Sequence, residues 1–170
     1  MKLVADTSGL VSIASTAKAR QQLLPMLLDS YEVTVPRQVI DELEAVGGYD
    51  DSHATAASAV LDSEPRLTIG TVDLDSTFPL DDGENAVVQL ANSLDAPFCY
   101  CDEYNRLSLI HASLSTTRLV TTPRLLKAFV DGGLISDDTA MELLEGIADA
   151  RSWSGNAYVQ QATRLFEGPE

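Results

Sequence analysis

The stretch Lys2–Leu10, KLVADTSGL, begins with a short apolar run that ends at Asp6. A run of this kind, followed by residues with helical spacing, indicates a buried strand that leads into a helix. The arrangement returns at Phe98–Asp102, where FCYC precedes another aspartate. In a parallel sheet covered by helices, ligands bind outside the carboxyl ends of the strands. We therefore expect Asp6 and Asp102 to meet at one edge of a sheet.

Strands and helices are predicted to alternate along the chain. Apolar runs predict strands at 2–5, 32–35, 67–72, 98–101 and 118–121. Helical spacing predicts helices at 10–14, 17–28, 37–46, 53–61, 82–94, 103–113, 123–130, 137–148 and 156–166. Alternation of this kind favours an α/β fold with a parallel sheet covered on both faces. The 170 residues contain no linker or repeat, so we expect a single domain spanning 1–170.

The chain is strongly acidic, with 26 Asp and Glu residues against 11 Lys and Arg residues and a net charge of −15. A hydrophobic content of 45% is ordinary for a folded core. We interpret the charge as that of a salt-adapted surface, because molar salt screens the self-repulsion of such a surface. The alternative is an acidic protein that does not meet nucleic acid.

The two cysteines and the N-terminus indicate a cytoplasmic protein. Cys99 and Cys101 lie two residues apart on one predicted strand. This spacing fits neither a redox pair nor half of a zinc site, so we expect reduced core thiols. The opening MKLVADTSG is too short and too acidic for a signal peptide, and no apolar run is long enough to cross a membrane.

Taken singly, each strand-end aspartate has a simpler explanation. Asp6 and Asp102 both precede a predicted helix, and aspartate is a common N-cap residue.

Glu42 is placed by the phase of its helix. Val39, Leu43 and Val46 form the apolar stripe of that helix. Glu42 borders this stripe, whereas Glu44 points toward water. A glutamate beside a buried stripe needs a partner or a metal ion, unless its side chain bends out to solvent.

Glu84 stands at the head of a second stripe. Val87, Val88 and Ala91 follow it at intervals of three, four and seven, which places Glu84 toward the sheet. The alternative is a capping box with Asp81, in which the glutamate returns to the backbone of the cap residue.

The four acids together exceed what capping requires. Two end strands and two lie on inward-facing sides of helices, and carboxylates gathered at one sheet edge repel each other unless cations neutralise them. The set of Asp6, Glu42, Glu84 and Asp102 therefore predicts a divalent metal site. Such a site predicts a metal-dependent phosphodiesterase, with RNA as the expected substrate.

These segments resemble the PIN-domain ribonucleases, the family of VapC-type toxins and ribosomal-RNA processing nucleases. VADTSGL resembles the first strand of that family and its turn, and VPRQVIDEL resembles the helix that carries the second acid. GENAVVQLA and CDEYNRLSLIHA resemble the segments of the third and fourth acids, and LVTTPRLLKAFVDGGLI resembles the closing strand and helix. The likeness runs from Met1 to about Ile135, so we expect a core at 1–135 and a helical extension at 136–170 packed on it.

The resemblance implies a three-layer α/β/α fold and a Mg²⁺ or Mn²⁺ site built from Asp6, Glu42, Glu84 and Asp102. It also implies a nearby hydroxyl from Thr7 or Ser8. Cys101 replaces a serine or threonine that often precedes the fourth acid, and Glu103 replaces the second aspartate of a pair. The family further implies an RNA substrate, a homodimer and, for a toxin, an antitoxin-like protein partner.

Two arginines are weaker candidates for contacts to the substrate. Arg106 follows Asp102 by one helical turn, and we favour an ion pair with an acid over a phosphate contact. Arg124 lies at the start of a helix, where it either faces the phosphate track or is an ordinary surface residue. The rival function is a non-catalytic binding module that keeps the fold and docks a partner through its C-terminal helices.

Overall fold

A computed structural model describes residues 1–166 of the chain. The strands form one five-stranded sheet in the order β3-β2-β1-β4-β5, and every neighbouring pair is parallel. β1 lies at the centre, where Lys2 pairs with Glu32 on one side and Ala5 pairs with Tyr100 on the other. The strands are β1 (Lys2–Ala5), β2 (Glu32–Pro36), β3 (Thr68–Gly70), β4 (Phe98–Tyr100) and β5 (Arg118–Val120).

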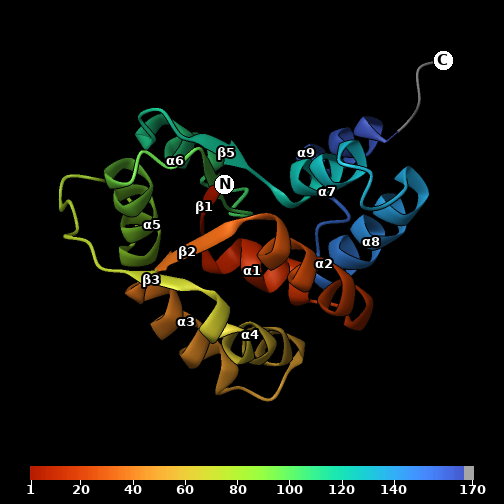
Figure 1. Cartoon of the computed structure of the whole chain (residues 1–170), viewed down its shortest axis with the longest axis horizontal. Helices are drawn as coiled ribbons and strands as arrows, with labels where there is room; N and C mark the ends of the chain where they lie inside the picture. The colour runs from red at the N-terminus through yellow and green to blue at the C-terminus, as the bar shows by residue number, and fades with distance from the viewer. Residues whose placement is uncertain (167–170) are drawn as a thin grey trace.

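Helices cover both faces of this sheet, which gives three layers (Figure 1). α5 and α6 lie on one side, and α1, α2, α7 and α8 lie on the other. The helices are α1 (Thr7–Ala14), α2 (Ala17–Ser30), α3 (Arg37–Gly47), α4 (Ser52–Asp62), α5 (Asp82–Ser93), α6 (Leu107–Ser113), α7 (Thr122–Asp131), α8 (Asp137–Ala150) and α9 (Ala157–Ala162), with short 3₁₀ turns at Glu64–Arg66 and Thr163–Leu165.

The core lies between the sheet and these helices because the central strands are apolar on both faces. Val4, Val35 and Cys99 are fully enclosed, as expected for strands covered from both sides. The same cluster includes Leu143 and Ile147 of α8, so the segment after residue 135 packs against the rest of the fold. Cys99 and Cys101 are buried and unpaired, as the sequence predicts.

A close packing contact positions the carboxyl end of β1. An added Cβ at Gly9 would come within 2.9 Å of the Tyr100 ring, so the absence of a side chain lets α1 approach β4. The backbone N–H of Asp6 donates to the carbonyl of Tyr100 at 2.9 Å and extends the pairing of the two strands by one residue. This contact fixes the direction in which Asp6 leaves the sheet.

The predicted order and number of strands are confirmed, but one helix near the site begins later than expected. α6 begins at Leu107, whereas the sequence predicts a helix from Glu103. Residues 102–106 form turns instead, in which the N–H of Tyr104 donates to the carbonyl of Asp102 at 2.9 Å. The side chain of Asp102 is consequently free to bond with a different helix.

Candidate active site

A cavity of about 420 Å³ lies at the carboxyl edge of the sheet. Asp6, Glu42 and Glu84 line it, although they come from the N-cap of α1, from α3 and from α5. The structure therefore brings together three of the four predicted acids. The complete lining is Asp6, Thr7, Ser8, Val11, Glu42, Val46, Tyr49, Asp51, His53, Asp81, Glu84, Glu103 and Arg151.

Asp6 is both the N-cap of α1 and a wall of this cavity. Its Oδ2 accepts a hydrogen bond from the backbone N–H of Ser8 at 3.1 Å, a short one from the Ser8 hydroxyl, and a long one from Cys101 Sγ at 3.5 Å. The predicted capping role is thus confirmed, and it uses only one carboxylate oxygen. No hydrogen bond to Oδ1 is found within residues 1–166. Asp6 can therefore cap the helix and still present an oxygen to a ligand.

Glu42 is held by two neighbours from other elements. The Thr7 hydroxyl donates a short hydrogen bond to Glu42 Oε2. On the other side the carboxyl group rests on the backbone of Gly83, where an added Cβ would overlap Oε1 and would lie 2.8 Å from Cδ. Glu42 therefore points into the cavity and not into solvent.

Glu84 takes part in a capping box and an ion pair. The N–H of Glu84 donates to Asp81 Oδ1 at 2.9 Å, and the N–H of Asp81 donates to Glu84 Oε2 at 3.3 Å. Arg106 Nη1 lies 2.8 Å from Glu84 Oε2 and 3.7 Å from Asp81 Oδ2. Both the predicted capping box and the predicted ion pair of Arg106 are confirmed, and Glu84 still lines the cavity.

Asp102 lies behind the cavity wall and is only 4% exposed. Its Oδ1 accepts from the Thr122 N–H at 2.7 Å and from the Tyr104 hydroxyl at 3.2 Å, and its Oδ2 accepts from the Thr122 hydroxyl at 2.6 Å. The first turn of α7 thus holds this carboxylate, whereas an N-cap at its own helix was the alternative that the sequence left open. The N–H of Asp102 also donates to Ser8 Oγ at 3.0 Å, which links it to Asp6 through one hydroxyl.

Burial raises the pKa of all four acids above its ordinary value. For Glu42, the hydrogen bond from Thr7 acts in the opposite direction, and the charges of Asp6, Asp81 and Glu84 raise the pKa further. For Asp102, hydrogen bonds from Thr122 and the positive charge of Arg151 act against burial. Carboxyl groups that resist ionisation for these reasons are stabilised as anions by a cation placed among them.

The donor set fits a hard divalent cation. No group of three or more His, Cys, Asp or Glu side chains within residues 1–166 is arranged closely enough to hold a metal ion as it stands. The cavity nevertheless offers oxygen ligands from Asp6, Glu42 and Glu84, and Mg²⁺ binds few carboxylates and keeps several waters. Gly83 leaves the space that the Glu42 carboxyl occupies, so the backbone of α5 accommodates this carboxyl group at the cavity.

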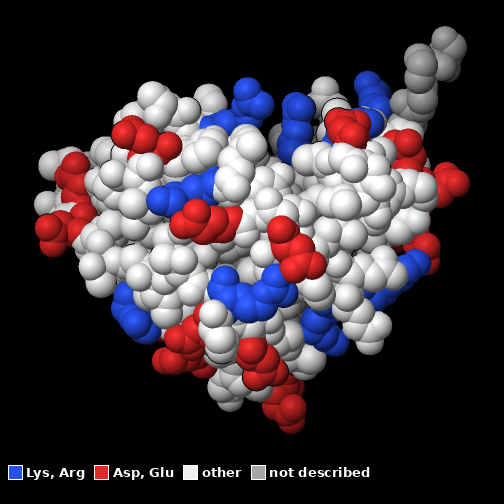
Figure 2. Space-filling model, in the orientation of Figure 1, with Lys and Arg blue, Asp and Glu red and all other residues white. Residues whose placement is uncertain are grey.

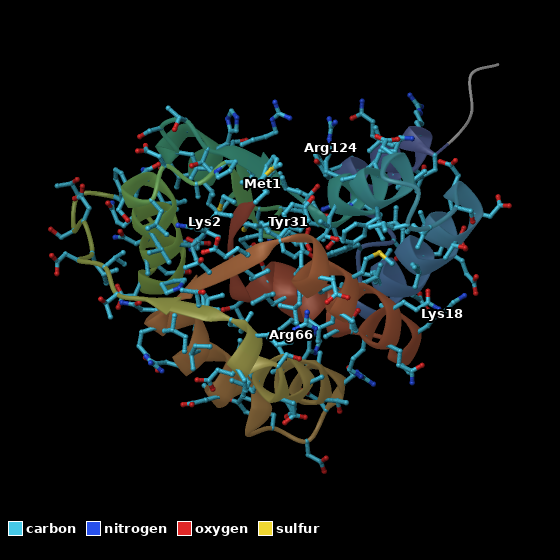
Figure 3. The ribbon with its side chains drawn as sticks, in the orientation of Figure 1. Met1, Lys2, Lys18, Tyr31, Arg66 and Arg124 are labelled. Carbon is cyan, nitrogen blue, oxygen red and sulfur yellow. The ribbon has the colours of Figure 1, made fainter. Side chains whose placement is uncertain are left out.

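Arg124 is not brought to the acids. It lines a separate cavity of about 850 Å³ between α6, β5 and α7, together with Tyr31, Arg118 and Lys127. Figure 3 shows Arg124 on α7, on the same face of the molecule as Tyr31. The structure therefore places the two candidate arginines apart, with Arg106 at the acid cavity and Arg124 elsewhere.

Sequence reasoning missed Arg151 as a part of the cavity. Its side chain lines the same cavity as the acids, although it lies 49 residues after Asp102 and belongs to the C-terminal segment. No local motif marks it, because the end of a helix often carries an arginine. Its place depends on how α8 packs against the earlier part of the fold.

The surface charge is not gathered into one patch on the face drawn in Figure 2. Acidic and basic side chains are interspersed there, and uncharged residues cover much of that face. Within residues 1–166, moreover, no helix is both long enough and apolar enough to span a bilayer.

Comparison with known proteins supports the assignment that the fold and the acids suggest. A family model for the PIN domain matches residues 2–168, which is almost the whole chain. A comparison with curated proteins found no significant match. The parallel sheet covered on both faces is the architecture expected for that family. The chain therefore belongs to the PIN-domain family, which has a nuclease-type fold.

Proposed function

We propose that this protein is a metal-dependent endoribonuclease that hydrolyses phosphodiester bonds of RNA. The observation that carries the proposal is the convergence of Asp6, Glu42 and Glu84 on one cavity from three separate segments of the chain. Burial raises the pKa of all three carboxyl groups, and the charges of Asp6 and Glu84 raise that of Glu42 further, which is a costly arrangement for a purely structural site.

Asp6, Glu42 and Glu84 would hold Mg²⁺ or Mn²⁺, and Asp102 lies next to Asp6 through Ser8. Bound there, the cation would lower the pKa of a water molecule and stabilise negative charge on the phosphate. Ser8 and Thr7 fix the carboxylates of Asp6 and Glu42 by hydrogen bonds, so these side chains do not have to reorganise when a ligand arrives.

Asp102 has a positioning role in this proposal. Its oxygens accept three hydrogen bonds from Thr122 and Tyr104, which anchors the end of β4 to the start of α7. Its backbone N–H then orients the Ser8 hydroxyl toward Asp6. The buried carboxylate thereby fixes the side of the cavity that is formed by the end of β4.

The proposal is tested by cleavage of a single-stranded RNA with and without Mn²⁺, in dilute and in molar KCl. Asp6→Asn removes one charge from the cavity while it retains a cap for α1. Asp95→Asn is the matched control, because Asp95 is exposed at the opposite end of the sheet and asparagine tolerates its positive φ of 44°. We expect cleavage that requires Mn²⁺ and that only Asp6→Asn abolishes. Equal cleavage by Asp6→Asn and wild type would refute the assignment.

A second candidate is a PIN-fold module that binds a partner and does not cut. Two observations favour it: Arg106 already neutralises Glu84, and both oxygens of Asp102 are bonded to protein donors. This candidate predicts that Mn²⁺ leaves the melting temperature unchanged and that no RNA is cleaved. A rise in melting temperature with Mn²⁺, absent in Asp6→Asn, favours the nuclease.

A further inference from the structure

Arg151 is the one lysine or arginine among the residues that line the acid cavity, as far as residues 1–166 describe it. Arg106 also lies near this region, but it is committed to Glu84 and Asp81. No acid within residues 1–166 lies within ion-pairing distance of Arg151, although Glu103 lines the same space. A guanidinium that faces carboxylates without pairing with them leaves its donors available for another anion.

The backbone around Arg151 holds its side chain at the cavity. α8 ends at Ala150, and the N–H of Arg151 still donates to the carbonyl of Ile147 at 2.8 Å. Ser152 then adopts a left-handed conformation with φ of 58°, and the N–H of Trp153 returns to the carbonyl of Ala148 at 2.7 Å. The chain therefore reverses directly after Arg151, and the position of this residue is set by a closed turn.

The guanidinium of Arg151 packs over the ring of Trp153. The carbon at its centre lies 5.9 Å from the centroid of the Trp153 ring, within the range of a cation–π contact. Trp153 is itself buried and meets Tyr104 edge-on at 4.9 Å, and Tyr104 donates to Asp102. Arg151 is thus connected to the acid site through rigid rings.

The Nε group of Arg151 is not used in a hydrogen bond to the described part of the protein, although this group is buried. An arginine carries five N–H donors, and a buried donor without a partner destabilises a fold. Planar arginine forks match the oxygens of a phosphate, so an anion of that geometry is a suitable acceptor for this side chain.

We propose that Arg151 binds a phosphate oxygen of an RNA strand that occupies the acid cavity. This inference rests on the proposed function, because that function supplies the RNA strand. The other charged residues that line the cavity are carboxylates, which repel a phosphate backbone, and Arg151 provides an attractive contact among them. The C-terminal segment after residue 135 thereby contributes a substrate-contacting residue.

The inference is tested by fluorescence anisotropy with a short fluorescein-labelled single-stranded RNA and Mn²⁺, at several KCl concentrations. The arginine variants are made in the Asp6→Asn background, so that the RNA stays intact, and RNA binding by the wild type is measured alongside. We expect Arg151→Gln to weaken binding about ten- to a hundredfold, as for the loss of a charged hydrogen bond. The slope of log affinity against log salt falls by about 0.7, because one phosphate contact to a single strand is lost.

Two further variants separate contact from general charge and from folding. Arg66→Gln removes the same charge from a residue that precedes β3 at the opposite end of the sheet and pairs with Asp29. We expect this variant to bind RNA as tightly as its Asp6→Asn parent. Arg151→Lys keeps the charge above Trp153 but loses the fork, so we expect intermediate affinity with an unchanged salt slope.

The outcomes distinguish this inference from the proposed function. Affinity of Arg151→Gln equal to that of Arg66→Gln would overturn the role of Arg151, even if the wild type cleaves RNA. Loss of affinity in Arg151→Gln alone upholds the inference, even if the wild type cuts no RNA with Mn²⁺ and the nuclease assignment fails. Absence of RNA binding by the wild type and by the Asp6→Asn background overturns both.

Discussion

Replacement of Gly83 by alanine should separate metal binding from stability. Gly83 lies in the first turn of α5, and an added methyl group would overlap Glu42 Oε1 and come within 3.1 Å of Oε2. The overlapping atoms belong to the end of a flexible side chain, so Glu42 can swing away without disturbing the core. The carboxyl group would then leave the cavity and lose its hydrogen bond from Thr7.

The two effects on stability should nearly cancel. Alanine in place of glycine favours a helix by about 1 kcal/mol. Loss of the hydrogen bond between Thr7 and Glu42 costs about 1 to 2 kcal/mol. The variant should therefore melt within about 4 °C of the wild type, because 1 kcal/mol moves the melting temperature by roughly 2–4 °C in a chain of this size.

The effect on Mn²⁺ binding should be larger. Loss of a group that orients a metal ligand typically weakens metal binding about 10- to 100-fold, and Gly83 is such a supporting position for Glu42. At a Mn²⁺ concentration of about 100 times the wild-type Kd, the metal adds about 2.7 kcal/mol to the wild type, and the same relation gives about 0.4 to 1.4 kcal/mol for Gly83→Ala. The difference corresponds to several degrees in the melting temperature.

The assay is thermal melting with a Mn²⁺ titration, and Gly146→Ala is the matched control. Gly146 lies inside α8, and an added Cβ there would meet only Thr16 Cγ2 at an ordinary 3.7 Å. We expect this control to be about 1 kcal/mol more stable than the wild type, with an unchanged response to Mn²⁺. If Gly83→Ala responds to Mn²⁺ as the wild type does, Glu42 is not a metal ligand.

Three further outcomes are expected. Thr122→Val should lower the free energy of unfolding in urea by about 1–3 kcal/mol, because the Asp102 carboxylate loses its 2.6 Å donor inside the protein; an unchanged urea midpoint would contradict this anchoring role. Burial raises the pKa of Asp6 from 3.8, so the metal-free protein should lose stability as the pH rises through the folded-state pKa of this group. Urea unfolding in EDTA at several pH values should show a weaker loss of stability for Asp6→Asn than for the wild type. Identical pH profiles of the two proteins would contradict this role of Asp6. Arg106→Gln should tighten Mn²⁺ binding up to about fivefold in calorimetric titration, because the half-exposed arginine competes with the metal for Glu84, and weaker binding would show that Arg106 supports the site instead.

The predicted elements near the site show how far local patterns reach. The apolar runs before Asp6 and Asp102 predict β1 and β4, and both strands are present. Asp6 follows β1 directly, and one residue separates Asp102 from the end of β4. A buried strand is specified by its own residues, so its existence follows from the local pattern. The start of α6 was misplaced, because Asp102 bonds with α7 and the turn at 102–106 replaces a first helical turn.

The alternatives left open for Glu84 and Asp6 turn out not to exclude the site. Asp6 caps α1 with one oxygen while it lines the cavity, and Glu84 completes a capping box while it does the same. A carboxylate has two oxygens and about four acceptor sites, so one residue can serve the backbone and a ligand together. A capping role therefore does not exclude a role in ligand binding for the same residue.

The sequence by itself determined the order of strands and helices, the parallel sheet, and the identity of the acids that could gather at its carboxyl edge. These properties depend on the spacing of apolar residues and on the geometry that all parallel sheets share. Only the tertiary structure decided that Asp102 is bonded to Thr122, that Glu42 rests on Gly83, and that Arg151 lines the same cavity as the acids. Each of these contacts joins residues distant in the chain, and their meeting depends on how whole helices pack against one another.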